Sequence, residues 1–554
     1  MIAYTTLLLF FIGIFSNIKV GVKVDKTLSF VTFASLFFVF AGFCDAFNAV
    51  REHVFTFTWN TATGSALKFD IISNSYNYWL VFPCFVLTMI GAFNSFLFNY
   101  EECRSAYLSV LTFNLVALII LITSSNFVQL LSALFVIDVL ALFLIKNVEA
   151  CRRYFLLNIF ADMILFTVLA VINCRVASLD IKQIILYRNV GMHQDFVALA
   201  GLTAVFAKFG FFLFQIGIAD LKNIRFHRLQ NILFMSSPLA AMILLLKFSV
   251  LWRTSQYFTT YIDIICICSL IWGGLGALCA DNFKSKVIYW QMAFWALFVE
   301  LLRFHGFIWF SGFSFLLLEM YAITTALYML YYYNNRRVSM CRIKTMPLTN
   351  KKNAAFVWAV MVAQIAAMSN TLTILYNNPN RYYIWAFAGV FMLSLSAVIK
   401  QLFTRKPSGI KSFLPMPKKR FMLLELALLC LILLQDWQFA EPSVWGGAIV
   451  FALLCAYNPL QKTEFVYDIS ALQNKDILGR IYHILIKSLR LCGKFFWLLI
   501  DRLFMEKMVL MFLISVVGGT LRFFRRLNTG KFGGLSAFTL LILLLWLSYQ
   551  GRNK

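Results

Sequence analysis

Charged side chains are scarce in this chain of 554 residues, since Asp, Glu, Lys and Arg make up only 13% of it. Hydrophobic residues make up 61%. Water-soluble domains carry about 25% charged residues, so this composition excludes a soluble domain. We therefore predict an integral membrane protein.

Signals for disulfide, metal and nucleotide sites are also missing. The 12 cysteines are scattered without a CxxC pair, and the 5 histidines show no ligand spacing. We expect neither a disulfide framework nor a protein-bound metal. No Walker motif, GxGxxG fingerprint, nucleophile elbow or HExxH motif occurs in a suitable context, so no cofactor is expected in this chain.

The net charge of +25 does not indicate nucleic acid as a partner. The basic residues are not gathered into one soluble region with aromatic residues between them, as a nucleic-acid surface would require. Membrane topology explains the positive charge better, because basic residues collect in the loops on one side of a membrane.

Long apolar runs dominate the chain. A helix needs about 20 apolar residues to cross a hydrocarbon core of roughly 30 Å. The runs are continuous and do not alternate, which excludes a transmembrane β-barrel. The predicted fold class is an all-α polytopic membrane protein with about sixteen transmembrane helices, at 2–18, 28–48, 79–98, 107–123, 126–145, 154–174, 197–218, 232–252, 262–280, 287–302, 307–333, 354–376, 382–402, 421–435, 443–457 and 533–549.

Lys and Arg sort between the two sides that these spans define. One side holds the cluster at 400–420 and basic residues near 19–26, 146–153, 222–228, 284–286 and 336–352, whereas the other side has few. By the positive-inside rule, the N-terminus lies on the side opposite the compartment that synthesises the chain. The first run has no basic flank or cleavage site before it and is predicted to be a retained helix.

A basic stripe follows the fifteenth span. Polar residues at spacings of three and four mark one face of an otherwise apolar helix: Arg480, His483, Lys487, Arg490 and Lys494. Such a helix is predicted to lie along the membrane surface or against other proteins. The alternative is the solvated edge of another span. The chain thus divides into N-terminal transmembrane helices (1–100), a transmembrane core (101–457), an amphipathic arm (458–530) and a C-terminal transmembrane anchor (531–554).

Three ionisable residues, Asp138, Asp162 and Lys208, lie near the middle of different apolar runs. A charge at bilayer depth costs roughly 3 kcal/mol or more, so it is a functional hypothesis by default. A neighbouring cation changes the proton affinity of a buried carboxylate, which makes a switchable relay feasible. The alternative is that these residues only hold helices together.

Other polar residues extend this hypothesis. Gln215, seven residues after Lys208, is expected on the same helical face, as part of a hydrated path or as an interhelical hydrogen bonder. Glu319 is a further deep ionisable group. Glu300, Arg303 and His305 lie near a predicted helix end and are interpreted as a solvated loop.

In order and spacing, these segments resemble chain 5 of respiratory NADH:ubiquinone oxidoreductase (complex I), a family of antiporter-like membrane subunits. SSNFVQLLSALFVIDVL is similar to the segment with the family's helix 5 glutamate, here Asp138. YFLLNIFADMILF keeps Asn158 and Asp162 of a family motif. Lys208 matches the helix 7 lysine, and PLAAMILLLKF, which ends near Lys247, resembles the next helix. Further matches are Asp220, Lys284, Tyr289, the MPLT segment at 346–349, and the DRLF and LRFFRRLNTG segments of the arm.

The chain also departs from the family pattern. The motif arginine is replaced by Ile159, and a histidine on the helix after Lys208 corresponds to Leu233. The central histidine and lysine are replaced, with Glu319 as the nearest ionisable residue. Prolines that break the family's helices are missing from IGIAD and from 354–376.

The resemblance implies an antiporter-like bundle with a C-terminal lateral helix, in an enzyme subunit that carries no redox site. Its proton pathway would include Asp138, Asp162, Lys208, Gln215, Lys247 and Glu319. NADH, FMN, iron-sulfur clusters and ubiquinone are expected in partner subunits. The partners are other membrane subunits of complex I, especially the antiporter-like siblings, together with lipids such as cardiolipin.

The expected location is the mitochondrial inner membrane, with the N-terminus on the intermembrane-space side and the lateral helix on the matrix side. The 60 phenylalanines fit an A/T-rich organellar genome. Two alternatives are a structural membrane-arm subunit that has partly lost proton conduction, and an autonomous cation/proton antiporter.

Overall fold

The computed structural model describes residues 2–17, 22–46, 53–60, 66–97, 104–145, 147–176, 180–181, 194–280 and 283–305, with Leu317, Met320, Tyr321 and Thr324. All of them belong to one compact unit, Met1–Asn474. Glu319, the predicted basic helix with Arg480, His483, Lys487, Arg490 and Lys494, and the predicted spans from 354 onward lie outside the described residues.

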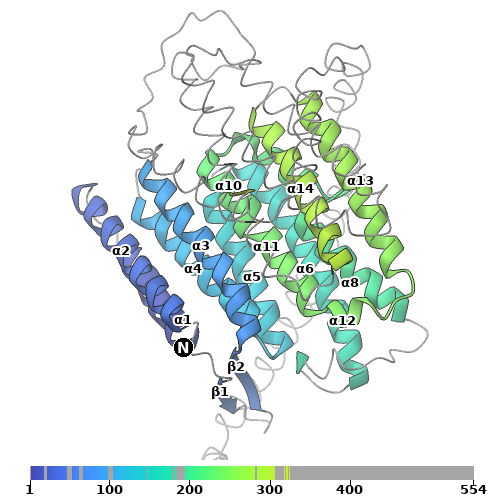
Figure 1. Ribbon diagram of the computed structural model, residues 1–554, viewed down its shortest axis with the longest axis horizontal. Helices are drawn as coiled ribbons and strands as arrows, with labels where there is room; N and C mark the ends of the chain where they lie inside the picture. Colours follow the sequence, from blue (N-terminus) through green and yellow to red (C-terminus); the bar gives the residue numbers. More distant parts are fainter. Residues whose placement is uncertain are drawn as a thin grey trace, which may run out of the picture. The chain divides into compact units, whose positions relative to one another are not determined.

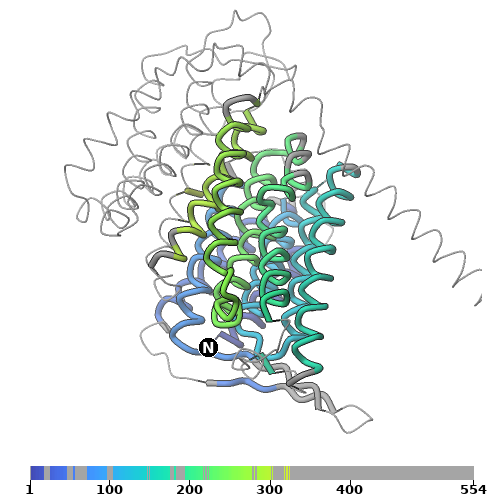
Figure 2. Tube along the Cα trace, turned by 90° about the vertical axis from the view of Figure 1, so that its right-hand side faces the viewer, coloured from blue at the N-terminus to red at the C-terminus, as the bar shows by residue number. Residues whose placement is uncertain are grey.

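The first part of the described chain contains four helices and a hairpin. α1 (Ile2–Ser16) and α2 (Val22–Ala46) precede strands β1 (His53–Asn60) and β2 (Ala66–Ser73), and α3 (Ser75–Leu97) and α4 (Arg104–Thr123) follow. α1 packs on α4, where Ser109 Oγ donates a 2.8 Å hydrogen bond to the carbonyl oxygen of Gly13. Figure 2 shows the described helices running side by side, with the hairpin near one end.

The described elements of the second part are helices, several of which are short. It contains α5 (Phe127–Leu144), α6 (Val148–Val176), α8 (Gln194–Phe209), α9 (Ile216–Ala219), the 3-10 turn η3 (Asp220–Asn223), α10 (Phe226–Met235), α11 (Ser237–Lys247), α12 (Ser249–Trp252), α13 (Phe258–Cys279) and α14 (Phe283–His305). Figure 1 places the hairpin and α12 toward the same, lower end of the bundle, which we call the hairpin end.

The hairpin corrects the all-α prediction. β1 and β2 pair antiparallel in a register from His53 opposite Ser73 to Asn60 opposite Ala66. The sequence carries a period-two signal, because Phe55, Phe57 and Trp59 alternate with threonines. This signal is weak beside the neighbouring apolar runs, because each strand spans only eight residues.

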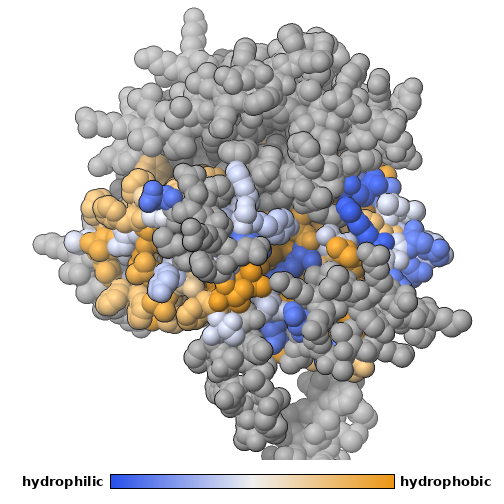
Figure 3. Space-filling model, turned by 60° about the horizontal axis from the view of Figure 1, so that its bottom comes forward, coloured by the Kyte–Doolittle hydropathy of each residue, from blue (hydrophilic) through white to orange (hydrophobic). Residues whose placement is uncertain are grey.

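Seven segments of the described helices are long and apolar enough to cross a membrane: Thr27–Asp45, Ser75–Ser95, Arg104–Thr123, Phe127–Leu144, Ala150–Cys174, Phe226–Lys247 and Phe258–Ala277. The chain is therefore a multi-pass membrane protein. Large apolar side chains also face outward from the bundle, such as Phe30, Phe38 and Phe143. Figure 3 shows broad orange areas over the described surface, interrupted by smaller blue groups.

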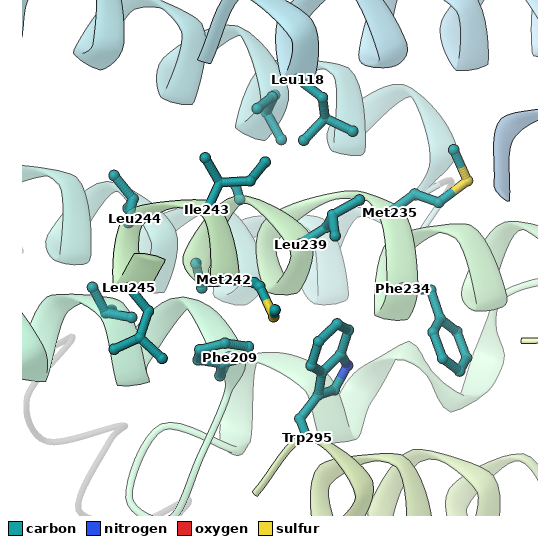
Figure 4. Packing of buried hydrophobic residues seen from close by; sticks show 14 of the residues in the cluster. Leu118, Phe209, Phe234, Met235, Leu239, Met242, Ile243, Leu244, Leu245 and Trp295 are labelled. Carbon is teal, nitrogen blue, oxygen red and sulfur yellow. The ribbon is translucent and has the colours of Figure 1, made fainter. Parts of the chain in front are cut away.

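The segment Phe226–Lys247 forms the centre of the described bundle, since its apolar window is entirely buried. In Figure 4, Leu239, Met242 and Ile243 of α11 lie between side chains of neighbouring helices, among them Leu118 and Trp295. The polar side chains of α10 are therefore held within the protein and away from lipid.

Two predicted spans are interrupted. The span predicted at 197–218 ends as α8 at Phe209 and resumes as α9 at Ile216, so this span is broken without a proline, a question that the sequence left open. Gly210 has a φ of 70° and Leu213 a φ of 77°, left-handed values that a continuous helix does not contain. The predicted span 232–252 begins earlier, at Phe226, and breaks at Ser236, where φ is −91° and ψ is −114°.

Candidate proton-transfer site

Asp138, Asp162 and Lys208 meet inside the bundle. The Lys208 Nζ atom lies 2.9 Å from Asp138 Oδ2 and 2.7 Å from Asp162 Oδ1. The three side chains come from α5, α6 and α8, and α6 packs along both other helices. By subtraction of residue numbers, Asp138 and Asp162 are 24 positions apart in the chain, and Asp162 and Lys208 are 46 positions apart. Helix packing therefore brings together charges that are distant in sequence.

Burial differs among the three side chains. Those of Asp138 and Lys208 are each 1% exposed, whereas that of Asp162 is 15% exposed. Asp138 Oδ1 and Asp162 Oδ2 are buried without a hydrogen-bond partner among the described residues. A buried carboxylate oxygen without a partner loses its hydration, which costs about 1–3 kcal/mol or more. One cation between two carboxylates also leaves one excess negative charge when both acids are ionised. A proton on either acid would neutralise that charge.

Polar groups of α6 and α11 continue from this centre. Asn158 lies one helical turn before Asp162, so both side chains leave α6 on one face. Ser237 Oγ donates a hydrogen bond to Asn158 Oδ1, and Asn158 Nδ2 donates a 3.0 Å bond to the carbonyl oxygen of Tyr154. Ser237 lies directly after the break between α10 and α11. The centre is thus bordered by buried polar groups at a helix interruption.

Lys208 lies in the last turn of α8, where a cation interacts favourably with the helix dipole. The chain then leaves the helix at Gly210. The freed backbone N–H of Phe212 donates a 3.0 Å hydrogen bond to Ser269 Oγ of α13. Phe209 and Phe211 stack with ring centroids 4.9 Å apart. Packing, this bond to α13 and local backbone hydrogen bonds, such as that from the N–H of Phe214 to the carbonyl oxygen of Phe211 (2.8 Å), thus hold the break without a proline.

The break corrects the placement of Gln215. A spacing of seven residues predicts a shared face with Lys208 only when the helix is continuous, and this helix ends between the two residues. Gln215 is buried directly before α9, and its Oε1 atom has no hydrogen-bond partner among the described residues. Its place in a proton pathway stays a prediction.

Lys247 ends α11 and binds the C-terminal end of α4. Its Nζ donates hydrogen bonds of 2.9 and 3.1 Å to the carbonyl oxygens of Leu121 and Ile122. It also donates to the carbonyl oxygen of Ser124 at 2.5 Å and to Ser124 Oγ at 2.6 Å. Because helix ends leave carbonyls without partners, Lys247 acts as a cap for α4. Its predicted part in a proton pathway stays a prediction.

A second ionic cluster overturns the interpretation of 300–305 as a solvated loop. Glu300 and Arg303 lie within α14, and Glu300 is buried. Arg303 Nε donates a 2.9 Å bond to Glu300 Oε2, and Arg303 Nη2 pairs with Asp263 Oδ1 of α13. The apolar run was predicted to end at 302, but the helix continues to His305 and packs along α13.

Sequence reasoning also missed a buried polar network on α10. Asn231 Nδ2 donates to the hydroxyl of Tyr107 on α4, and the Tyr321 hydroxyl donates a 2.6 Å bond to Asn231 Oδ1. Gln230 Nε2 donates a 2.8 Å bond to the carbonyl oxygen of Tyr321. The available signal was the adjacent pair Gln230 and Asn231 within an apolar segment.

The fold and this centre define a class: a polytopic helical membrane protein with interrupted helices and a buried ionic centre. Comparison with known proteins supports the same class. No protein-family profile and no curated protein sequence matches the chain. Solved structures do match it in fold.

One similar structure is a chain of the Mrp complex from Dietzia sp. DQ12-45-1b, with a TM-score of 0.64 and 14% identity over 99% of this chain. The match spans only 62% of that longer chain. A chain of respiratory complex I from Thermus thermophilus matches with a TM-score of 0.60 and 14% identity, covering 82% of this chain and all (100%) of that one.

The third similar structure is the membrane-bound sulfane sulfur reductase, an archaeal respiratory membrane complex. It matches with a TM-score of 0.63 and 13% identity, covering 85% of this chain and 98% of that one. At these identities the likeness is one of fold. The predicted resemblance to antiporter-like membrane subunits is thereby confirmed at the level of the fold.

Proposed function

We propose that this chain is an antiporter-like membrane subunit of respiratory complex I that contributes to proton translocation. NADH:ubiquinone electron transfer would take place in other subunits and drive the protons. The observation that carries the proposal is the contact of one buried ammonium, Lys208, with two carboxylates, Asp138 and Asp162. Such charges at bilayer depth are expensive and typical of proton relays.

The geometry provides two alternative charge states. In one, Lys208 is shared between two ionised carboxylates. In the other, a proton enters at the partly exposed Asp162, which becomes neutral, and Lys208 then pairs with Asp138 alone. Because Lys208 contacts both acids, a proton can pass among the three groups by small side-chain movements. A conformational change in a partner subunit would select between the two states.

The proposed setting follows the family resemblance. The chain would lie in the mitochondrial inner membrane beside antiporter-like sibling subunits, with cardiolipin among the surrounding lipids. NADH, FMN, iron-sulfur clusters and ubiquinone would be bound by partner subunits. The basic helix with Arg480, His483, Lys487, Arg490 and Lys494 would lie along the matrix surface against these partners.

The assembly can be tested by purifying the native complex through a tag on this chain and measuring its mass, composition and NADH:ubiquinone activity. Co-purification with a large oxidoreductase is the expected result. Isolation of a single-chain transporter with cation-dependent proton flux would contradict the proposal and support an autonomous cation/proton antiporter.

The relay can be tested by counting protons pumped per electron in the reconstituted complex. Asp138→Asn and Lys208→Met are expected to lower this ratio while the complex stays assembled. Asp25→Asn is a matched control, because Asp25 is a buried carboxylate that accepts 3.1 Å bonds from the backbone N–H groups of Arg104 and Ser105. Unchanged pumping in both relay variants would assign the chain a structural role.

A further inference from the structure

A second cluster of ionisable groups lies between α13 and α14, away from the three residues of the proposed relay. It consists of Asp263, Glu300 and Arg303. Asp263 lies five residues after the start of α13 and Glu300 five residues before the end of α14, by subtraction from the helix bounds. Because α13 begins after α12, the cluster lies toward the hairpin end of the bundle (Figure 1).

This cluster repeats the charge arrangement of the first site. One cation, Arg303, contacts two carboxylates, so one negative charge is in excess when both acids are ionised. Glu300 Oε2 accepts from Arg303, but Glu300 Oε1 is buried without a hydrogen-bond partner among the described residues. Arg303 cannot neutralise both acids fully. A proton on Glu300 would remove the excess charge and supply the buried oxygen with a donor.

Exposure increases in order across the cluster. The side chain of Glu300 is 4% exposed, that of Arg303 15% and that of Asp263 37%. Protons held at Glu300 thus have a charged, increasingly exposed route outward. A purely structural ion pair between Arg303 and Asp263 would not require Glu300 to be buried beside it with an oxygen that lacks a hydrogen-bond partner among the described residues.

A row of side chains on α13 runs from this cluster toward the break after Lys208. Ser269 Oγ accepts the backbone N–H of Phe212 at the break and donates a 2.6 Å bond to the carbonyl oxygen of Ile265. Ser269, Cys266 and Asp263 follow one another at spacings of three along α13, which places them at neighbouring positions on the helix surface. Ser269 and Cys266 are buried. At 1.5 Å per residue, this row spans about 9 Å.

We propose that Glu300, Arg303 and Asp263 form a second protonatable site through which protons pass between the Lys208 centre and the hairpin end of the bundle. This inference rests on the proposed function, because it supplies that relay with a route on one side. Proton transfer here needs no further reactant. The proton moves onto Glu300 Oε1 and leaves by way of Asp263, and Arg303 keeps its charge throughout.

The protonation of Glu300 can be tested without any variant. Dicyclohexylcarbodiimide reacts with protonated carboxyl groups in apolar surroundings, so the native complex is treated with it and its peptides are analysed by mass spectrometry. Labelling at Glu300 that declines as the pH rises is the expected result. An unlabelled Glu300 throughout the pH range would overturn the inference.

The role in transport is tested by protons pumped per electron in the reconstituted complex carrying Glu300→Gln, which keeps the shape of the side chain. Loss of pumping with retained electron transfer is expected. Asp195→Asn is the control, since Asp195 is another carboxylate near the hairpin end and accepts the N–H of Gln256 at 3.1 Å. If Glu300→Gln pumps normally and Asp138→Asn does not, the second site is rejected but the proposed function stands. Normal pumping in both would reject the proposed function as well.

Discussion

Replacing Gly210 with alanine should destabilise the interrupted helix that follows Lys208. Gly210 has a φ of 70°, a left-handed value that costs about 1–2 kcal/mol for a residue with a Cβ atom. A Cβ atom there would also overlap the Cδ1 atom of Ile218 and lie 2.7 Å from its Cγ1 atom. Overpacking of this kind costs about 1–3 kcal/mol. The sum predicts a loss of about 2–5 kcal/mol in the free energy of unfolding.

The two contributions can be separated with the variant Ile218→Ala, which removes the overlapping atoms and leaves only a Cβ atom at 3.9 Å. Unfolding is measured by titration with SDS in mixed micelles. The double variant is expected to be less destabilised than the sum of the two single variants by about 1–3 kcal/mol, the cost of the overlap. The cost of the left-handed backbone conformation at residue 210, about 1–2 kcal/mol, should remain in the double variant.

Gly42→Ala in α2 provides the control, because no atom lies within 4 Å of a Cβ atom placed there. In a helix this replacement is expected to be neutral or to stabilise by up to about 1 kcal/mol. If Gly210→Ala were as stable as the wild type, the described break would be wrong. If the double variant were additive within about 0.5 kcal/mol, the overlap with Ile218 would not account for the loss.

Three further replacements should lower the free energy of unfolding in the same SDS titration. Lys247→Met removes an ammonium whose three N–H groups are shared among four acceptor oxygens at the end of α4, and it should cost about 1–3 kcal/mol. Asp25→Ala removes the acceptor of two backbone N–H groups at the start of α4 and should cost about 1–2 kcal/mol. Gly273→Ala would place a Cβ atom 2.7 Å from the carbonyl oxygen of Tyr289 and force α13 and α14 apart, at a cost of about 1–3 kcal/mol.

Each of these replacements has its own check. Lys247→Arg keeps a donor and should retain part of the stability lost in Lys247→Met; equal losses would argue against the cap. Asp25→Asn keeps one acceptor oxygen, so it should be milder than Asp25→Ala. Gly273→Ala is compared with Gly42→Ala, and equal stability of the two would contradict close packing between α13 and α14.

Much of the described helix content could be predicted from apolar runs. The runs at 107–123 and 126–145 correspond closely to α4 and α5. Their length alone identifies them, because the cost of exposing the backbone to lipid makes helices obligatory. The hairpin was missed because its two strands are short and lie between much stronger apolar signals.

The candidate site was predicted only in part. Asp138, Asp162 and Lys208 stand out in sequence because each interrupts an apolar run. The cluster of Glu300 and Arg303 was misread, since it lies where apolarity declines while the helix continues to His305. Hydropathy follows the membrane boundary and does not report where a helix ends.

The sequence by itself determined that this chain enters a membrane and that it keeps a few costly charges within apolar runs, because transfer free energy depends on local composition. Only the tertiary structure decided which charges meet. Lys208 contacts both acids because α5, α6 and α8 pack together and α8 ends at the break beside it. That arrangement depends on contacts between distant segments, and no local pattern encodes it.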